Sequence, residues 1–291
     1  MNEIAYHLNE CAYAAAALLA HSAEADGTAG RFIAHPLRIF SIPHFAFLAF
    51  FWPLAVVVAR VVAKKHGFSK KVIWTVAVLA ALCEAERILF FLAPIGGEVT
   101  GYRLPPNHLP FNICLFQIFL IYSLALSAAP EKRRKSLAFM YPMMVVGGAI
   151  GMLIPAAAMP FHGLSDFATY RYMFLHAMIV FFGFYLYWSK PFTYTIRDYG
   201  TSMACAVAML YVAILLNSFF GWDQTVNHLF VALGVPAAGL PVLNMDHGWG
   251  FFILQMAGAC VTLFAVCYHR EIARDLPSVV KAIKSRTKGK K

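Results

Sequence analysis

Long apolar runs limit what this chain can fold into more than any other feature. Seven stretches reach the length of about 20 residues that an α-helix needs to cross the hydrocarbon core of a bilayer. They are Pro43–Val62, Val72–Ala93, His108–Ala128, Leu137–Ala158, Tyr172–Trp188, Tyr199–Phe220 and Gly248–Tyr268. Lipid offers the backbone no hydrogen-bond partners, so such runs must be helical. Only 13% of the residues are charged and 60% are hydrophobic, which excludes an ordinary soluble domain with about 25% charged residues.

The pattern therefore predicts an all-α polytopic membrane protein, a bundle of seven transmembrane helices. An outer-membrane barrel would instead show segments of about 10 residues with alternating hydrophobicity. We expect an extracytoplasmic segment with an interfacial helix at residues 1–38, the transmembrane domain at 39–269 and a basic cytoplasmic tail at 270–291. The apolar stretch Val226–Asn244 contains Pro236 and Pro241, which favours a loop that dips toward the membrane over an eighth span.

The lysines and arginines set the expected orientation. With seven spans, 18 of the 24 Lys and Arg residues fall on the side that carries the loop after the first span and the C-terminal tail, and four fall on the other side. Arg60 and Arg87 lie inside spans. Because cytoplasmic loops are enriched in Lys and Arg, the N-terminus is predicted outside and the C-terminus inside. The basic tail then acts as a topology anchor near anionic lipid, and nucleic-acid binding is not expected.

Polar residues inside the spans collect near one side. The residues concerned are His44, Glu84, Glu86, Arg87, Cys114, His176, Asn217 and His247. The predicted topology places all of them in the outer half of the membrane or at its outer edge. Ionisable groups within a bilayer are rare and usually functional, and unrelated structural accidents would scatter over both halves. We therefore expect one polar site in the outer layer.

Cys114 and His176 are the candidates for chemistry at that site. Each lies a short distance inside its own span, so the two are predicted at similar depth. Pro110 suits the first turn of a helix, and a cysteine near a helix N-terminus is favoured as a thiolate. A thiol beside an imidazole is the minimum for nucleophilic acyl transfer. The alternative is that both are packed core residues.

Other polar residues are expected to support the pair. Asn112, Gln117 and Asn217 carry amides that can donate hydrogen bonds to an oxyanion, and Gln117 shares the helix face of Cys114. Glu84 or Glu86 is a candidate to orient a histidine.

Other roles for these polar residues remain open. Glu84 and Arg87, three residues apart, can form an internal ion pair. His44 and His247 are expected to be solvated near span ends. His44, His176 and His247 together are an alternative metal site, although no fixed ligand spacing supports it, and no metal or cofactor is expected.

The sequence resembles the YwaF-type bacterial integral membrane proteins and their animal relative, transmembrane protein 164. The resemblance extends from about Phe40 to Tyr268. It rests on Phe40–His44, Leu109–Cys114, Tyr172–His176, Leu216–Asn217 and His247–Gly248. It implies a cysteine-dependent acyltransferase that moves fatty acyl groups between phospholipids, with Cys114 and His176 at the positions of the family's Cys and His motifs.

Two functional hypotheses follow. The first is a lipid acyltransferase or lipid-ester hydrolase of the bacterial plasma membrane, with Cys114 as nucleophile, His176 as base and membrane lipids as partners. The second is a proton-coupled transporter or channel built on Glu84, Glu86, Arg87 and the histidines. A scaffold protein, which would tolerate loss of every named residue, is a third option.

Overall fold

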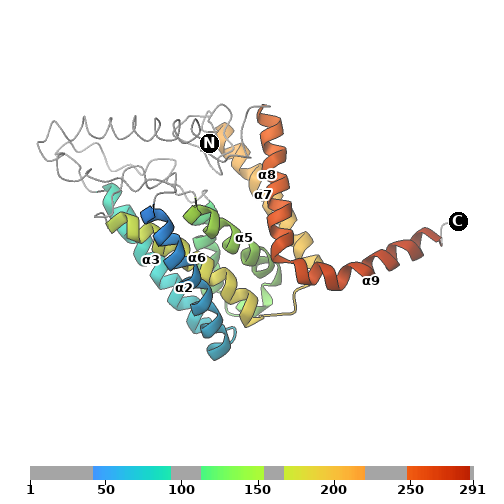
Figure 1. The fold of residues 1–291 in the computed structure, drawn as a ribbon, viewed down its shortest axis with the longest axis horizontal. Coiled ribbons are helices and arrows are strands. Elements are labelled where there is room, and N and C mark those ends of the chain that lie inside the picture. The colour runs from blue at the N-terminus through green and yellow to red at the C-terminus, as the bar shows by residue number, and fades with distance from the viewer. Residues whose placement is uncertain (1–41, 93–112, 154–166, 220–247, 289–291) are drawn as a thin grey trace, which may run out of the picture.

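The chain folds into helices wherever its backbone is described. The computed structural model describes residues 42–92, 113–153, 167–219 and 248–288. In this part of the chain the elements are α2 (Ile42–His66), α3 (Lys70–Leu92), α4 (Ile113–Ala125), the 3₁₀ turn η3 (Pro130–Lys132), α5 (Arg134–Leu153), α6 (Phe167–Ser189), α7 (Ile196–Phe219), α8 (Trp249–Cys267) and α9 (His269–Lys288). Each of the seven predicted runs overlaps one of the helices α2–α8, so the all-helical class is confirmed for the described residues (Figure 1).

Five of these helices are long and apolar enough to cross a membrane. They are His44–His66, Arg134–Leu153, Thr169–Ser189, Ile196–Phe219 and Trp249–Cys267. α3 is 23 residues long but carries Glu84, Glu86 and Arg87 in its second half. The described part of α4 has only 13 residues, although they are strongly apolar.

α5 and α6 form the centre of the bundle. In each of them 61% of the most apolar stretch is buried, compared with 11% in α2 and α8. α2 packs on α6, and α7 packs on α5, so the two central helices separate these flanking helices (Figure 1). The outer faces of α2, α7 and α8 carry exposed large apolar side chains such as Val57, Tyr211 and Leu254, as expected for helices that face lipid.

Glycines allow α5 and α6 to approach closely. A Cβ atom at Gly183 would lie 2.8 Å from the backbone nitrogen of Val145, and one at Gly148 would lie 2.8 Å from Cγ2 of Val180. Apolar side chains gain little from leaving lipid, so close backbone contact through small residues is a main source of helix association in membranes. This contact fixes the register of α5 against α6, and with it the position of His176.

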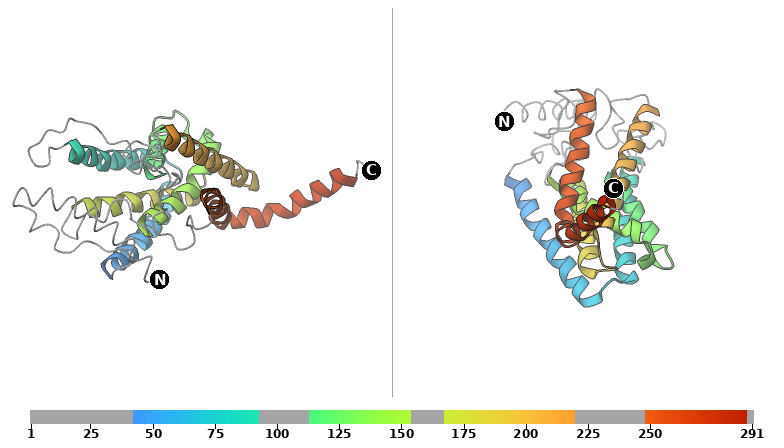
Figure 2. Two further views of the ribbon diagram at one scale, coloured as in Figure 1. Left: turned by 90° about the horizontal axis from the view of Figure 1, so that it is seen from above. Right: turned by 90° about the vertical axis from the view of Figure 1, so that its right-hand side faces the viewer.

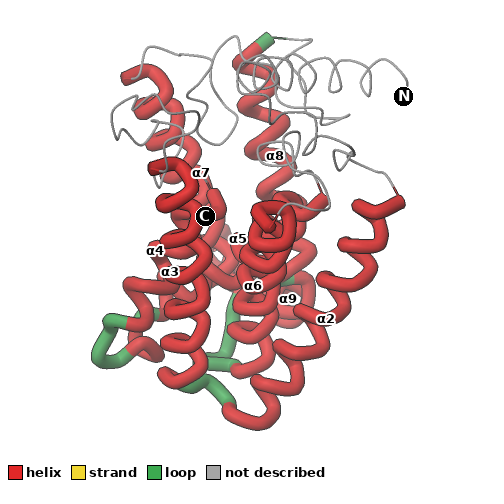
Figure 3. The backbone as a smooth tube through the Cα atoms, turned by 90° about the vertical axis from the view of Figure 1, so that its left-hand side faces the viewer, coloured by secondary structure: helices red, strands yellow, loops and turns green. Residues whose placement is uncertain are grey.

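Three described connections lie at one end of the bundle, between α2 and α3, between α4 and α5, and between α6 and α7 (Figure 3). They carry most of the lysines and arginines of the described loops. Tyr185 of α6 fixes the first connection, because its hydroxyl donates to the carbonyl of Gly67 at 2.8 Å and accepts from the N–H of Ser69 at 2.7 Å.

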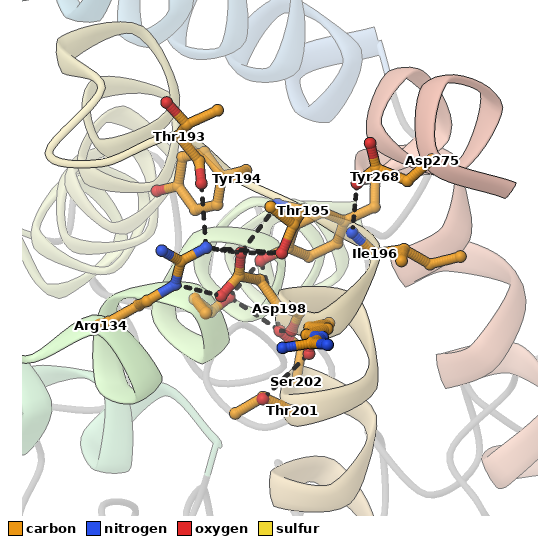
Figure 4. Close-up of polar contacts among 12 residues, drawn as sticks. Arg134, Thr193, Tyr194, Thr195, Ile196, Asp198, Thr201, Ser202, Tyr268 and Asp275 are labelled. Carbon is orange, nitrogen blue, oxygen red and sulfur yellow. Dashed lines mark hydrogen bonds and ion pairs between the residues drawn. The ribbon is translucent and has the colours of Figure 1, made fainter. Parts of the chain in front are cut away.

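Asp198 is the centre of a polar network at this same end (Figure 4). Arg134 of α5 donates to its two carboxylate oxygens at 2.8 and 2.7 Å. The N–H and hydroxyl of Thr195 donate to one of those oxygens, each at 2.8 Å, which caps the N-terminus of α7. Asp275 of α9 accepts from the N–H of Ile196 at 3.0 Å. The hydrogen bonds from Arg274 and Ile196 hold the pKa of Asp275 below its usual range. The network therefore joins α5, α7 and α9.

The predicted basic tail forms the helix α9. α9 follows α8 directly and projects away from the bundle (Figure 2). Ile272, Leu276, Val279 and Val280 recur at helical spacing along it, while its other face is basic. Leu276 and Val280 are 46% and 40% exposed. This is the pattern of a helix that lies at a membrane interface.

Several predictions fall on residues outside the described part of the chain. They are the interfacial helix within residues 1–38, the loop Val226–Asn244 and the residues Asn112 and His247.

We expect Asp198→Ala to destabilise the protein by about 2 kcal/mol, the scale of losing charge-assisted hydrogen bonds, since the Arg134 side chain is 48% exposed and is solvated once its partner is lost. The Asp198 side chain is only 6% exposed, and its loss also removes the cap of α7. Thermal unfolding of the detergent-solubilised protein measures the effect as a lower midpoint. Glu131→Ala, at an exposed acid of η3, is the control. Equal thermal unfolding midpoints for the Asp198→Ala and Glu131→Ala variants would contradict a stabilising role for the Asp198 network.

Candidate active site

Cys114 and His176 lie in direct contact although 62 residues separate them. The Sγ atom of Cys114 is 2.9 Å from Nε2 of His176. Cys114 is in the first described turn of α4, and His176 is in the first half of α6. His176 is only 2% exposed, whereas Cys114 is partly buried. The pair predicted from the depth of the two residues is therefore formed.

A main-chain oxygen orients the imidazole. Nδ1 of His176 lies 2.9 Å from the carbonyl oxygen of Tyr172, one turn earlier on α6. A carbonyl can only accept, so Nδ1 must carry a hydrogen, and Nε2 shares the proton of the thiol. The sequence analysis suggested that Glu84 or Glu86 orients a histidine. For His176 this is wrong, because both ring nitrogens are already engaged by other groups.

Gly151 of α5 makes room for the ring. A Cβ atom at this position would overlap Cδ2 of His176 and lie 2.6 Å from its Nε2. Tyr172 closes the other side, with its ring centroid 4.1 Å from that of the imidazole. Its hydroxyl donates to the carbonyl of Gly151 at 2.8 Å. The imidazole is thus held between a glycine and an aromatic ring that are themselves hydrogen bonded.

Comparison with known protein families gives a match over the part of the chain that contains the Cys114–His176 pair. A model of the TMEM164 family matches residues 39–268, which include α2 to α8 and both residues of the pair. The chain belongs to the TMEM164 family. No curated protein and no solved structure matches the chain. The resemblance to transmembrane protein 164 that the sequence motifs indicate is therefore confirmed as family membership.

His44 is buried in this TMEM164 family member, not solvated as expected from its place near a span end. It has no exposed surface, and its Nε2 lies 2.9 Å from the carbonyl oxygen of Met152. Met152 follows Gly151, so His44 and Tyr172 satisfy consecutive carbonyls near the described end of α5. Side chains from α2 and α6 therefore both bond to main-chain carbonyls of α5.

Gln117 lies one turn beyond Cys114 and is fully buried. Its Nε2 donates to the carbonyl of Met143 at 2.9 Å, which uses one of the two N–H groups of the amide. Its Oε1 is buried without a hydrogen-bond partner within the described chain. Of the two predicted amides that the structure describes, Gln117 and Asn217, Gln117 is the one on the same helix as the thiol.

Two further predicted residues, Asn217 and Glu84, lie on helices other than α4 and α6. Asn217 is buried on α7, a helix whose main neighbours are α5, α8 and α9. Glu84 is partly buried on α3, which packs beside α4. Glu86 and Arg87 lie on α3, but their side chains are outside the described set, as are Asn112 and His247.

A metal site is not formed by the described residues. Among them, no group of three or more His, Cys, Asp and Glu side chains is arranged to hold an ion. His44 and His176 belonged to the alternative metal site, and each directs an Nε2 atom to another protein group.

Sequence reasoning did not assign Tyr172 or Gly151 to the site. Tyr172 appears in the sequence analysis only as the first residue of a span and of the motif Tyr172–His176. The spacing of four residues between Tyr172 and His176 was the available signal, because it places the Tyr172 ring beside the histidine on one helix face.

We expect Gly151→Ala to separate the thiol from the imidazole, because the added methyl group occupies the place of the ring. The rate of Cys114 alkylation by iodoacetamide, followed by mass spectrometry of the peptide, reports the change. Gly258→Ala adds a methyl group with nothing within 4 Å and should leave the rate unaltered. Gly148→Ala disturbs α5–α6 packing at Val180 without meeting His176. The same rate in the Gly151 and Gly148 variants would contradict a specific effect on the pair.

Proposed function

We propose that the protein is a membrane-embedded lipid acyltransferase or lipid-ester hydrolase that uses Cys114 as nucleophile and His176 as general base. The observation that carries the proposal is the 2.9 Å contact between Sγ and Nε2, formed by two apolar helices of a TMEM164 family member. A buried thiol–imidazole pair whose base is oriented by a third group is the arrangement of cysteine-dependent acyl transfer.

In the first half of the reaction the thiol is acylated. Nε2 of His176 takes the thiol proton while Sγ attacks the carbonyl carbon of a fatty ester. The tetrahedral intermediate collapses with cleavage of the ester C–O bond, and the proton on Nε2 passes to the departing alcohol oxygen. The products are an acyl-thioester on Cys114 and a lysolipid.

In the second half an acceptor hydroxyl gives its proton to Nε2 and attacks the thioester carbonyl. The C–S bond breaks, and the proton returns from Nε2 to the thiolate. A lipid hydroxyl as acceptor gives transfer, and water gives hydrolysis. Tyr172 keeps Nδ1 protonated throughout, so Nε2 is the only ring atom that exchanges a proton.

Donors for the oxyanion are available near the thiol. Main-chain N–H groups at the start of a helix point away from intrahelical acceptors, and Cys114 lies in the first described turn of α4. The second N–H of Gln117 is a further donor, and Asn112 and Asn217 remain candidates from the sequence. Such donors are usually a large part of the stabilisation in acyl transfer.

The proposed topology sets the class of acyl donor. Seven spans, with the N-terminus outside and the C-terminus inside, place the pair toward the outer side of the bacterial plasma membrane. Thioesters of coenzyme A are cytoplasmic, whereas the ester groups of phospholipids lie at the level of the interface. A phospholipid donor therefore fits the site better than an acyl-CoA.

We expect Cys114→Ala to abolish acyl transfer between phospholipids in proteoliposomes, and His176→Ala to lower it by about 10²–10⁴-fold, the usual contribution of a general base. Cys83→Ala, at another partly buried cysteine packed against the same core, is the matched control. Mass spectrometry should also detect an acyl-thioester on Cys114. Full turnover in both Cys114 and His176 variants would overturn the proposal.

The transporter alternative gives the opposite pattern. Flux that survives Cys114→Ala and is lost in Glu86→Gln would favour transport, since acyl transfer depends on the thiol and an ion pathway depends on the carboxylate.

The proposed orientation is open to a direct check. In a variant free of native cysteines, Lys132→Cys should react with a membrane-impermeant maleimide only in inverted vesicles. Arg103→Cys, on the side predicted to be outside, should react in intact cells. Reaction of both from the same side would contradict the predicted single span between Arg103 and Lys132.

A further inference from the structure

A long apolar groove runs between α2, α3 and α6, which lie side by side in the bundle (Figure 1). Its cavity volume is about 550 Å³, within the range of about 300–1,000 Å³ typical of small-molecule sites. Side chains along it include Leu54 and Val58 of α2, Val72 and Leu79 of α3, and Phe181 of α6.

The groove is separate from the candidate active site. At 3.6 residues per turn, Met178 and Phe181 point about 200° and about 140° away from His176 around α6. His176 faces Cys114 and Gly151, whereas Met178 and Phe181 line the groove. A ligand in the groove therefore lies on the other face of α6 from the thiol.

One end of the groove is polar and basic. His66, Ser69 and Lys71 line it there. The sequence from Ile42 to Cys83 contains no Asp or Glu, so its other charged residues, Arg60, Lys64, Lys65 and Lys70, are also positive. The hydrogen bonds of Tyr185 to Gly67 and Ser69 hold this connection in place. That end thus offers a cluster of cations and hydrogen-bond donors with no acidic residue in the sequence from Ile42 to Cys83.

The length of the groove fits an acyl chain. Along α2 it extends from Phe51 to His66, about 22 Å at 1.5 Å per residue, while one leaflet contributes about 15 Å of hydrocarbon. Basic pockets between transmembrane helices on the cytoplasmic side are known to bind anionic lipid head groups.

We propose that this groove binds one phospholipid with an anionic head group. The phosphate lies at His66, Ser69 and Lys71, and one acyl chain extends along α2 and α6 toward Phe51. The proposal does not rest on acyl transfer, since the bound lipid lies on the opposite face of α6 from Cys114. It is a binding site for a resident lipid of the basic side of the membrane.

Two neighbouring lysines test the head-group end. Lys71 lines the groove and Lys70 does not, and both are exposed. The full-length, delipidated protein is titrated with phosphatidylglycerol, and native mass spectrometry measures the fraction that carries one lipid. We expect Lys71→Gln to weaken binding by about 5-fold, the scale of one basic residue near an anionic surface, and Lys70→Gln to leave it close to the original value. Equal losses in the two variants would indicate only a diffuse basic surface and would overturn the proposal.

Two neighbouring valines test the apolar part. Val58 lines the groove and Val57 does not, and they are 39% and 57% exposed. Val58→Trp should fill the groove and lower phosphatidylglycerol binding by at least 5-fold, whereas Val57→Trp should not. Equal phosphatidylglycerol binding by the Val58→Trp and Val57→Trp variants would mean that the lipid does not occupy the groove. It would then be an ordinary boundary lipid or be held by its phosphate alone, and either result overturns the proposal.

A second pair keeps the test available if Val58→Trp does not fold. Thr75 is exposed and lines the groove from α3, while Val78, also exposed on α3, does not. Thr75→Phe should weaken lipid binding relative to Val78→Phe. Phosphatidylcholine serves as the lipid control, and wild-type protein that binds both lipids equally would contradict recognition of an anionic head group.

Discussion

Main-chain carbonyl oxygens hold the polar side chains at the centre of this bundle. His44 bonds to Met152, Gln117 to Met143, Tyr172 to Gly151 and His176 to Tyr172. A buried polar group without a partner is costly in an apolar medium, and a carbonyl has two lone pairs. The helices can therefore satisfy these side chains from their own backbones. The contact of Sγ with Nε2 differs because it joins two side chains.

This arrangement depends on the close approach of α5 and α6. The absence of a Cβ at Gly148 and Gly183 brings the two backbones together, and the absence of a Cβ at Gly151 leaves the space that the imidazole fills. At the basic end, Asp198 and Arg134 join α5 to α7, and Tyr185 joins α6 to the connection between α2 and α3. The same two central helices thus position both the candidate active site and the groove on the other face of α6.

The sequence predicts the helices well because an apolar run of about 20 residues in lipid has one stable backbone form. It also predicts the meeting of Cys114 and His176, since similar depth on separate spans limits where the two can lie. The sequence does not predict the group that accepts a hydrogen bond from Nδ1 of the His176 ring. Carboxylates are the residues that sequence patterns single out for that role, whereas any residue supplies a carbonyl, so Tyr172 is not distinguished in advance.

His44 and α9 show a similar limit. Proximity to a span end suggests water around His44, and only the packing of α2 on α6 and α5 reveals that the ring is enclosed. In the tail, the number of basic residues indicates a topology anchor but says nothing about its secondary structure. The recurrence of Ile272, Leu276 and Val279 at helical spacing is the signal that indicates a helix.

The hydrogen bond between Nδ1 of His176 and the Tyr172 carbonyl has a consequence for how the protein enters the membrane. Because Nδ1 keeps its hydrogen, Nε2 and Sγ share a single proton, and the pair has zero net charge whichever of the two atoms holds it. During biogenesis, α4 and α6 can each pass into lipid with a neutral thiol and a neutral imidazole. The Cys114–His176 pair is then assembled without the cost of carrying an ion into hydrocarbon.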